Sequence, residues 1–265
     1  MFDRVAETYD SVGVPWFTPI ARQLVDELAP AAGESALDIG CGRGAALWPL
    51  ADAVGGEGRV TGIDLSTEMV RATGADLAAT GLGHVTLKVM DASDPDLEPA
   101  SFDVIASSLV LFFLPDPAAA LRSWWQLLAP GGRLGISTFG PRDQLWTDID
   151  KLFVPYLPQQ LLDARTSGIA GPFSSDAGMA ALLGAAGFDT TRTVGISQPV
   201  SFSDVGEWHA WARSHGERAM WDAVGDNAEA IRSRAAELLA AGRGPDGRTV
   251  LTQQVRLSLA VRPKE

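Results

Sequence analysis

The sequence predicts an α/β fold in which a parallel sheet carries helices on both faces. Apolar segments typical of buried strands alternate with segments typical of helices from about residue 31 to residue 140. This alternation is typical of a doubly wound parallel sheet. The first strand, at residues 35–39, runs into three glycines at alternate positions, Gly40, Gly42 and Gly44. Backbone N–H groups at such a loop and helix start can face an anionic or nucleotide ligand, so the loop predicts a nucleotide-cofactor cradle.

The spacing of this glycine loop separates the cofactor classes. Dinucleotide-binding loops follow the pattern G-x-G-x-x-G, whereas residues 40–44 read GCGRG, so the third glycine comes one residue early. An acidic residue, Asp38, stands just before the loop. Both features disfavour NAD. Cys41, the only cysteine, cannot form an internal disulfide, and we interpret it as a small residue whose backbone matters.

Two further strands follow, each with an acidic residue at its carboxyl end. The second is expected at residues 59–64 and ends in Asp64. A helix should start near Ser66, whose hydroxyl can cap free N–H groups. The third strand, at residues 85–90, is followed by Asp91. Ligands of open parallel sheets bind beyond the carboxyl ends of the strands, so both acids are candidate ligand contacts.

The fourth and fifth strands complete the alternating part. The fourth is expected at residues 102–107 and runs into a loop at residues 108–115. Pro117 is well placed in the first turn of a helix that reaches about residue 128. The sequence LAPGG at residues 128–132 marks a turn before the fifth strand.

These landmarks, in this order, resemble the class I S-adenosylmethionine (SAM) dependent methyltransferases. Asp38 and the three glycines resemble motif I of that family, residues 102–115 resemble motif IV, and residues 128–132 resemble the turn before its fifth strand. The resemblance implies a Rossmann-like, seven-stranded sheet, mostly parallel with an antiparallel edge strand. It also implies a SAM site, whose expected residues include Asp38, Gly40, Cys41, Gly42, Gly44, Asp64, Asp91, Ala92 and Ser107.

The resemblance gives the residues after each strand a role, and each role has a structural alternative. Asp64 would accept both ribose hydroxyls, or would only stabilise the start of the next helix. Asp91 would contact the adenine, or would lie in a solvated acidic loop. Leu65 and Met69, just past Asp64, should contact the adenine or the ribose edge, with Met69 as an ordinary core residue as the main alternative. The glycines themselves could be turn residues without a ligand.

The chain after residue 140 departs from the alternating pattern. Residues 141–200 form a mixed segment in which we expect a capped helix at 174–187 and a sixth strand at 189–200. The last strand is expected within residues 250–265, and in the family these two strands form the antiparallel edge pair. The intervening residues 201–249 have apolar residues at helical spacing, which predicts a helical cap inserted over the active-site end of the sheet.

Residues 1–30 form an N-terminal arm with its own signature. The sequence FDRVAETYD resembles the opening segment of small-molecule methyltransferases related to the menaquinone and ubiquinone C-methyltransferases. In that branch the tyrosine closes over the cofactor, so Tyr9 is a candidate SAM lid. A helical stripe that packs on the domain is the alternative. Trp16 and Phe17 could line the substrate site or pack on the surface.

Methyl transfer is an in-line displacement at carbon, so the enzyme mainly aligns donor and nucleophile. The motif IV region, SSLV from residue 107, offers no charged or amide side chain as a base, and the Asn/Asp-Pro-Pro-Tyr motif of enzymes that modify adenine, cytosine or glutamine is missing. His215 in the cap is the best available proton acceptor, with a partly exposed histidine at a helix end as the structural alternative. The expected substrate pocket comprises Trp16, Phe17, Phe112, Trp208 and Trp211.

Composition limits the substrate class and the location. With 265 residues, 46% hydrophobic residues and a net charge of −12, we expect a single globular domain that does not bind nucleic acid, because phosphate binding depends on basic patches. The sequence shows neither a signal segment nor an apolar window long enough to span a bilayer, which predicts a cytoplasmic protein without membrane contact. The three histidines lack matching carboxylate spacing, so no metal site is expected.

The sequence therefore predicts an enzyme that transfers a methyl group from SAM to O, N or C of a small, apolar or aromatic molecule of the specialised-metabolite type. A peptide substrate is also compatible, and the enzyme is expected to be a monomer or a homodimer. One alternative is a protein that uses bound SAM for a non-methylating reaction such as a cyclisation, or as a binding module. The other is an NAD(P) oxidoreductase, which the glycine spacing disfavours.

Overall fold

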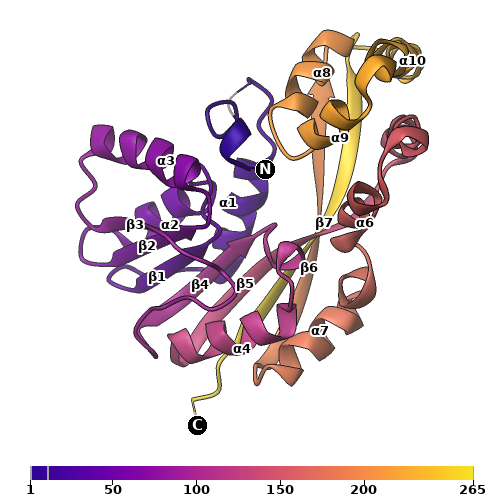
Figure 1. Ribbon diagram of the computed structural model, residues 1–265. Coiled ribbons are helices and arrows are strands. Elements are labelled where there is room, and N and C mark those ends of the chain that lie inside the picture. Colours follow the sequence, from indigo (N-terminus) through magenta and orange to yellow (C-terminus); the bar gives the residue numbers. More distant parts are fainter. Residues whose placement is uncertain (1, 11, 265) are drawn as a thin grey trace.

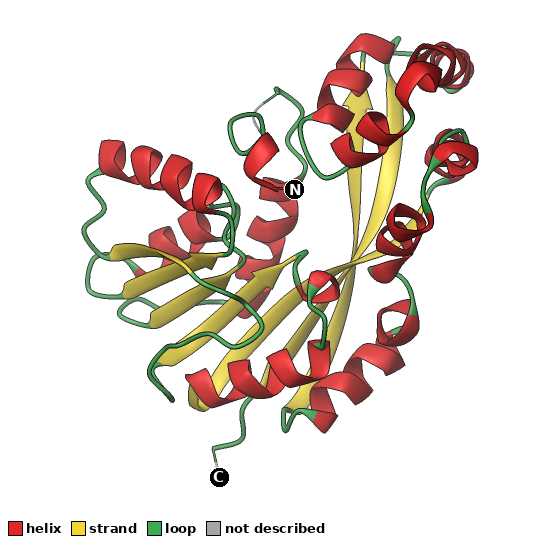
Figure 2. Ribbon diagram, in the orientation of Figure 1, coloured by secondary structure: helices red, strands yellow, loops and turns green. Residues whose placement is uncertain are grey.

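The computed structural model describes residues 2–10 and 12–264, without the side chains of residues 164–167 and 190. Met1 and Ser11 of the predicted arm, and Glu265 of the predicted last segment, lie outside the described residues. The centre is a seven-stranded sheet in the order β3-β2-β1-β4-β5-β7-β6, with helices on both faces (Figures 1 and 2). The strands are β1 Ser35–Ile39, β2 Arg59–Asp64, β3 Val85–Val89, β4 Phe102–Ser108, β5 Leu128–Arg142, β6 Asp189–Phe202 and β7 Thr249–Val261.

The strand directions confirm a mostly parallel sheet with antiparallel pairing near one edge. The pairs β3–β2, β2–β1, β1–β4 and β4–β5 are all parallel. β7 runs antiparallel to both β5 and β6, so the reversed strand lies one position inside the edge. The winding reverses between β1 and β4, and the carboxyl ends of these strands mark the place where ligands of such sheets bind.

Helices shield the central strands from both sides, which explains why β1 and β4 are almost continuously buried. α1, α2 and α3 lie on one side of the sheet, and α4 and α7 on the other (Figure 1). No helix among the described residues is both long and apolar enough to cross a membrane. The helices are α1 Phe17–Leu28, α2 Leu47–Val54, α3 Thr67–Thr80, α4 Pro117–Leu127, α5 Gln144–Lys151, α6 Gln159–Ser167, α7 Asp176–Ala185, α8 Val205–Arg213, α9 Arg218–Ala223 and α10 Ala228–Ala241.

The predicted helix starts are confirmed where a capping residue was recognised. The Ser66 hydroxyl accepts the Met69 N–H at 3.2 Å and caps α3. α4 begins at Pro117, preceded by an Asp116 cap. α7 is shorter than predicted, because Ser175 is the capping residue and the helix ends before the left-handed Gly187.

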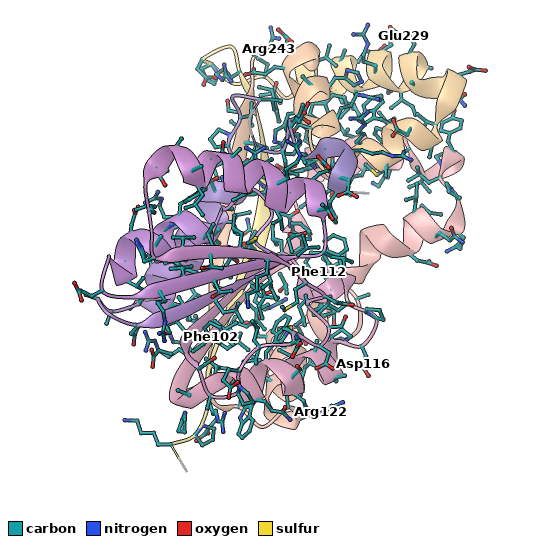
Figure 3. All side chains as sticks on the ribbon, turned by 60° about the vertical axis from the view of Figure 1, so that its left-hand side comes forward. Phe102, Phe112, Asp116, Arg122, Glu229 and Arg243 are labelled. Carbon is teal, nitrogen blue, oxygen red and sulfur yellow. The ribbon has the colours of Figure 1, made fainter. Side chains whose placement is uncertain are left out.

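The insertion between the last two strands is helical, as predicted. It contains α8, α9 and α10, carried on β6 and β7, which extend well beyond the parallel strands (Figure 1). Glu229 and Arg243 mark its outer end, on the opposite side of the molecule from Asp116 at the start of α4 (Figure 3). Trp208 and Trp221 are buried and pack on each other with ring centroids 5.6 Å apart, so the insertion has an aromatic contact of its own. We call residues 201–249 the cap.

Candidate cofactor and substrate site

The glycine loop turns sharply out of β1 and is fixed by the neighbouring strand. Gly40, Gly42 and Gly44 all have positive φ, at 72°, 47° and 87°. The N–H groups of Gly40 and Cys41 both donate to the carbonyl of Ile63 in β2, at 2.8 and 2.9 Å. The loop is therefore a rigid extension of the sheet edge.

The three glycines serve different purposes. A Cβ on Gly40 would lie 2.3 Å from a methyl of Val110, and one on Gly44 would lie 2.4 Å from the Trp48 indole nitrogen, so protein packing excludes a side chain at both. A Cβ on Gly42 would meet nothing within 4 Å. Only Gly42 leaves open space above the backbone, as a ligand cradle requires.

Asp38 supplies a buried carboxylate beside this loop. It is 1% exposed, and its Oδ2 has no hydrogen-bond partner among the described residues. Burial and the Asp64 carboxylate raise the pKa of Asp38 to about 8, against a backbone hydrogen bond from Leu47 that lowers it. A cation near this oxygen would relieve the penalty, so the site fits the ammonium of the methionine part of SAM. Burial also raises the pKa of the Cys41 thiol, which leaves it a poor nucleophile.

Asp64, at the end of β2, is the second acidic residue of the site. Its Oδ2 accepts the N–H of Gly42 and its Oδ1 that of Ser66, both at 2.8 Å. Burial raises the pKa of Asp64, although these two N–H groups lower it. The neighbouring Leu65 side chain is 70% exposed, so an apolar surface lies open beside the carboxylate. A planar adenine against Leu65 and ribose hydroxyls on Asp64 fit this edge.

The predicted site residues at the ends of β3 and β4 differ in exposure. Asp91 is exposed, and its side chain accepts the N–H of Ser93 at 2.8 Å. Ala92 is buried, and its carbonyl accepts the Trp124 indole N–H at 2.7 Å, which ties the loop to α4. Ser107 is fully buried at the end of β4, and its hydroxyl has no partner among the described residues.

The arm lies across this edge. Val5 and Ala6 pack against Met69, which is only 2% exposed and lies beneath the arm. Its contact with the adenine or the ribose edge stays a prediction. The ring of Tyr9 stacks on Phe17 with centroids 4.4 Å apart. Burial raises the pKa of Tyr9, as do the charges of Asp10 and Asp64. Tyr9 therefore connects the arm to Phe17 at the start of α1.

Trp16, Phe17, Trp211 and His215 form one cluster of contacting aromatic rings, and we use the name chamber for these four residues. His215 contacts the other three rings at centroid distances of 5.4, 5.6 and 4.5 Å for Trp16, Phe17 and Trp211. Phe139, at the end of β5, stacks on Trp16 at 5.8 Å. The structure thus brings together residues from the arm, α1, the sheet and the cap.

Phe112 and Trp208 lie outside the chamber. Phe112 is located where the parallel strands end (Figure 3) and contacts Phe139 at 5.2 Å, so it adjoins the chamber through that ring. Trp208 points into the cap and packs on Trp221 at 5.6 Å. This arrangement gives no support to the prediction of Trp208 as a pocket residue, because the indole ring of Trp208 packs inside the cap.

His215 is not the partly exposed helix-end residue of the structural alternative. It lies beyond the last residue of α8 and is only 3% exposed. Its Nδ1 accepts the backbone N–H of Glu217 at 3.4 Å. Burial and the positive charge of Arg142 lower the pKa of His215 to about 3, so the ring is neutral at physiological pH.

Arg142, which the sequence analysis did not identify, anchors this region. Its guanidinium binds Asp150 at 2.5 Å and Glu217 at 3.0 Å, and lies over the Trp146 ring at 4.5 Å. Arg142 and Trp146 are four residues apart in a segment rich in aromatic residues, but no local pattern shows that Glu217 of the cap is the partner. Only the folded chain joins residues so distant in sequence.

The described residues contain no group of three or more His, Cys, Asp or Glu that could hold a metal ion. His84 Nε2 lies 3.2 Å from the carbonyl of Ala51, and His209 packs on Trp221. Neither histidine reaches the chamber in a contact that the structure records.

Comparisons with known proteins agree with this geometry. Residues 36–132 match a family model described as a methyltransferase domain. The chain is 36% identical to nocamycin O-methyltransferase of Saccharothrix syringae over 84% of each chain. It is 41% identical to aklanonic acid methyltransferase DauC of Streptomyces sp. (strain C5), over 61% of this chain and 74% of that protein.

A solved structure extends the likeness in fold to nearly the whole chain. Phosphoethanolamine N-methyltransferase 2 of Haemonchus contortus, in complex with S-adenosyl-L-methionine, superposes with a TM-score of 0.61. The likeness covers 98% of this chain and 57% of that one at 18% identity. Together with the glycine loop, the two acids and the strand order, these findings show that the chain belongs to the class I SAM-dependent methyltransferases of the small-molecule branch, with SAM as its cofactor.

Proposed function

We propose that this enzyme methylates an oxygen atom of an apolar or aromatic specialised metabolite. The observation that carries the proposal is the chamber, a cluster of buried aromatic rings on which Tyr9 of the arm stacks. The resemblance to a nocamycin O-methyltransferase and an aklanonic acid methyltransferase supports oxygen as the acceptor and a metabolite as the substrate. Aromatic side chains with few charges favour a planar, apolar substrate.

The chain's own residues would bind and align the reactants. Bound SAM supplies a methyl group on a positively charged sulfur. Asp38 and Gly42 would hold the methionine part, Asp64 the ribose, and Leu65 the adenine. The chamber would exclude water and hold the acceptor oxygen in line with the methyl group, since alignment accounts for much of the rate of a displacement.

Several further assignments belong to the proposal. We propose that residues 31–140 bind SAM, that residues 1–30 close over it and that the cap shapes the substrate pocket, all within one domain. A cytoplasmic location and a monomer or homodimer complete the proposal. The net charge of −12 supports a small molecule in preference to a nucleic acid.

Calorimetric titration with S-adenosylhomocysteine (SAH) tests the cofactor assignment. Wild type should bind, and Asp64→Asn, which keeps the shape of the side chain, should bind at least about tenfold more weakly, because a charge-assisted hydrogen bond contributes roughly 1.5 to 3 kcal/mol. Asp52→Ala, an exposed site on α2, is the matched control and should bind like wild type. Equal affinity in all three proteins would contradict the site.

Release of SAH from SAM, with mass spectrometry of the product, tests the reaction. A panel of aromatic acids, phenols and alcohols that includes aklanonic acid should give an O-methylated product. Consumption of a panel compound without SAH release would instead support a non-methylating reaction in the same pocket.

A further inference from the structure

The chamber contains two hydrogen-bond donors without an acceptor. His215 and Trp16 are 3% and 2% exposed, and their ring centroids lie 5.4 Å apart. In the described part of the chain, neither His215 Nε2 nor Trp16 Nε1 has a hydrogen-bond partner. Native proteins rarely leave buried polar groups unpaired, because each loses its hydrogen bonds to water. An acceptor group of a ligand beside these two rings would satisfy both nitrogens.

The hydrogen bond at Nδ1 of His215 defines whether Nε2 is a donor or an acceptor towards a ligand. Nδ1 accepts the N–H of Glu217, so its lone pair is occupied. A neutral imidazole carries one proton, which must then reside on Nε2. Arg142 holds the side chain of Glu217 at 3.0 Å and so fixes this turn of the cap. His215 therefore presents an N–H to the chamber, and the Trp16 indole nitrogen is always a donor.

Charged groups of both signs lie near these donors, and the Asp10 carboxylate accepts the backbone N–H groups of Trp16 and Phe17 at 2.9 and 3.3 Å. The positive charge of Arg142 lowers the pKa of His215. The Asp150 and Glu217 carboxylates lie on the guanidinium of Arg142. No carboxylate in the described residues is recorded as a partner of either ring nitrogen in the chamber.

We propose that His215 and Trp16 are substrate-orienting donors, and that they bind an acceptor group whose negative charge is shared by two oxygens. A carboxylate and the enolate of a β-dicarbonyl both have this chemistry. One oxygen would accept the N–H groups while the other faces the methyl group. This inference rests on the proposed O-methylation and replaces the expected role of His215 as a base.

Such a substrate needs no general base, which matches the absence of one in motif IV. The oxygen forms a bond to the methyl carbon, the carbon–sulfur bond breaks, and its electron pair returns to sulfur. The anion and the sulfonium become a neutral methyl ester or enol ether and a neutral thioether. No proton is released, whereas methylation of a neutral hydroxyl releases one proton for each SAH formed.

Three variants distinguish a donor from a base and from simple packing. His215→Gln places an amide N–H near the position of Nε2 but cannot act as a base, and it should retain kcat/KM within about fivefold. His215→Phe keeps the aromatic packing but removes the donor, and it should lower kcat/KM about 10- to 100-fold, mainly through KM. Trp16→Phe should behave similarly, while Trp146→Phe removes the same group from the same aromatic cluster and serves as the control for lost volume.

The opposite ranking overturns the proposal. If the ring only packs, His215→Phe will be tolerated and His215→Gln will not. If the histidine is a base, both variants will be inactive. An effect of Trp146→Phe equal to that of Trp16→Phe would assign the loss to packing.

Proton release measured in weak buffer, relative to SAH formed, gives an independent test. The panel pairs aromatic carboxylic acids and β-dicarbonyl compounds with phenols and alcohols of the same skeleton. Turnover of the carboxylic acids without proton release is expected, whereas a β-dicarbonyl compound should release protons only in proportion to the fraction that is un-ionised in solution. The two classes identify the source of the anion. Turnover only of phenols or alcohols, or of no acid, contradicts the inference. In that case SAH binding and methyl transfer to a hydroxyl would leave the proposed function intact.

Discussion

Two buried titratable groups should give the stability of this protein opposite dependences on pH. Burial and the Asp64 carboxylate raise the pKa of Asp38 from 3.8 to about 8. Burial and Arg142 lower the pKa of His215 from 6.5 to about 3. In the unfolded chain both groups titrate near their ordinary values, so folding changes the number of protons that each one binds.

The signs follow from which state holds the proton. Below about pH 6.5 the unfolded chain protonates His215 and the folded chain does not, so acidification lowers the free energy of unfolding by about 1.4 kcal/mol per pH unit. For Asp38 the folded carboxyl already holds its proton, so its contribution is complete below its unfolded pKa and is lost as the pH rises towards 8. Between about pH 4.5 and pH 6.5 the two slopes should cancel in the wild-type protein.

Urea unfolding of wild type, Asp38→Asn and His215→Gln at about pH 4.5, 5.5 and 6.5 measures this cancellation. Relative to wild type, Asp38→Asn should lose about 2 to 3 kcal/mol on acidification across this window, and His215→Gln should gain a similar amount. The other carboxylates are common to all three proteins, so their contributions cancel when the free energies of unfolding are subtracted. If both differences stay constant within about 0.5 kcal/mol, the assigned burial of these two charges is refuted.

Four further substitutions test the packing around the cofactor edge. Gly40→Ala would collide with Val110 and should lower the free energy of unfolding by about 1 to 3 kcal/mol, whereas Gly42→Ala, which meets nothing within 4 Å, should cost only about 1 to 2 kcal/mol of backbone strain and mainly weaken SAH binding. Met69→Ala removes the support of the arm, so limited proteolysis should cleave within residues 1–16 faster than in wild type while the rest of the chain stays resistant. Trp124→Phe loses the hydrogen bond to the loop after β3, which should cost about 1 to 3 kcal/mol in urea unfolding.

The sequence predicts the cofactor half of this molecule well, because its signals are local. Strand β1, a turn with positive φ at Gly40, Gly42 and Gly44, and helix α2 follow one another within residues 35–54. Ser66 and Pro117 mark helix starts for reasons that depend only on their neighbours. The cofactor edge follows from the order of these segments.

The substrate half depends on contacts that no local pattern encodes. Trp16 and His215 are 199 residues apart in the chain and share a ring contact only because the cap folds back over α1. The aromatic spacing in the cap predicted a helix, but not that Trp208 would face Trp221 while Trp211 faces the chamber. Arg142 is a similar case, since its partner Glu217 lies in the insertion.

The N-terminal arm is bonded to two parts of the molecule at once. The Ser66 hydroxyl donates to Asp3 at 2.5 Å, and the Arg43 guanidinium donates to the Ala6 carbonyl at 2.7 Å. From the cap, Arg218 donates to the Arg4 carbonyl at 3.2 Å.

A segment held in this way cannot leave one neighbour without straining its bonds to the other. Lifting the arm away from the sheet would therefore also break its hydrogen bond to the cap. Because we propose that the arm closes over SAM, we expect exchange of the cofactor to disturb the cap as well.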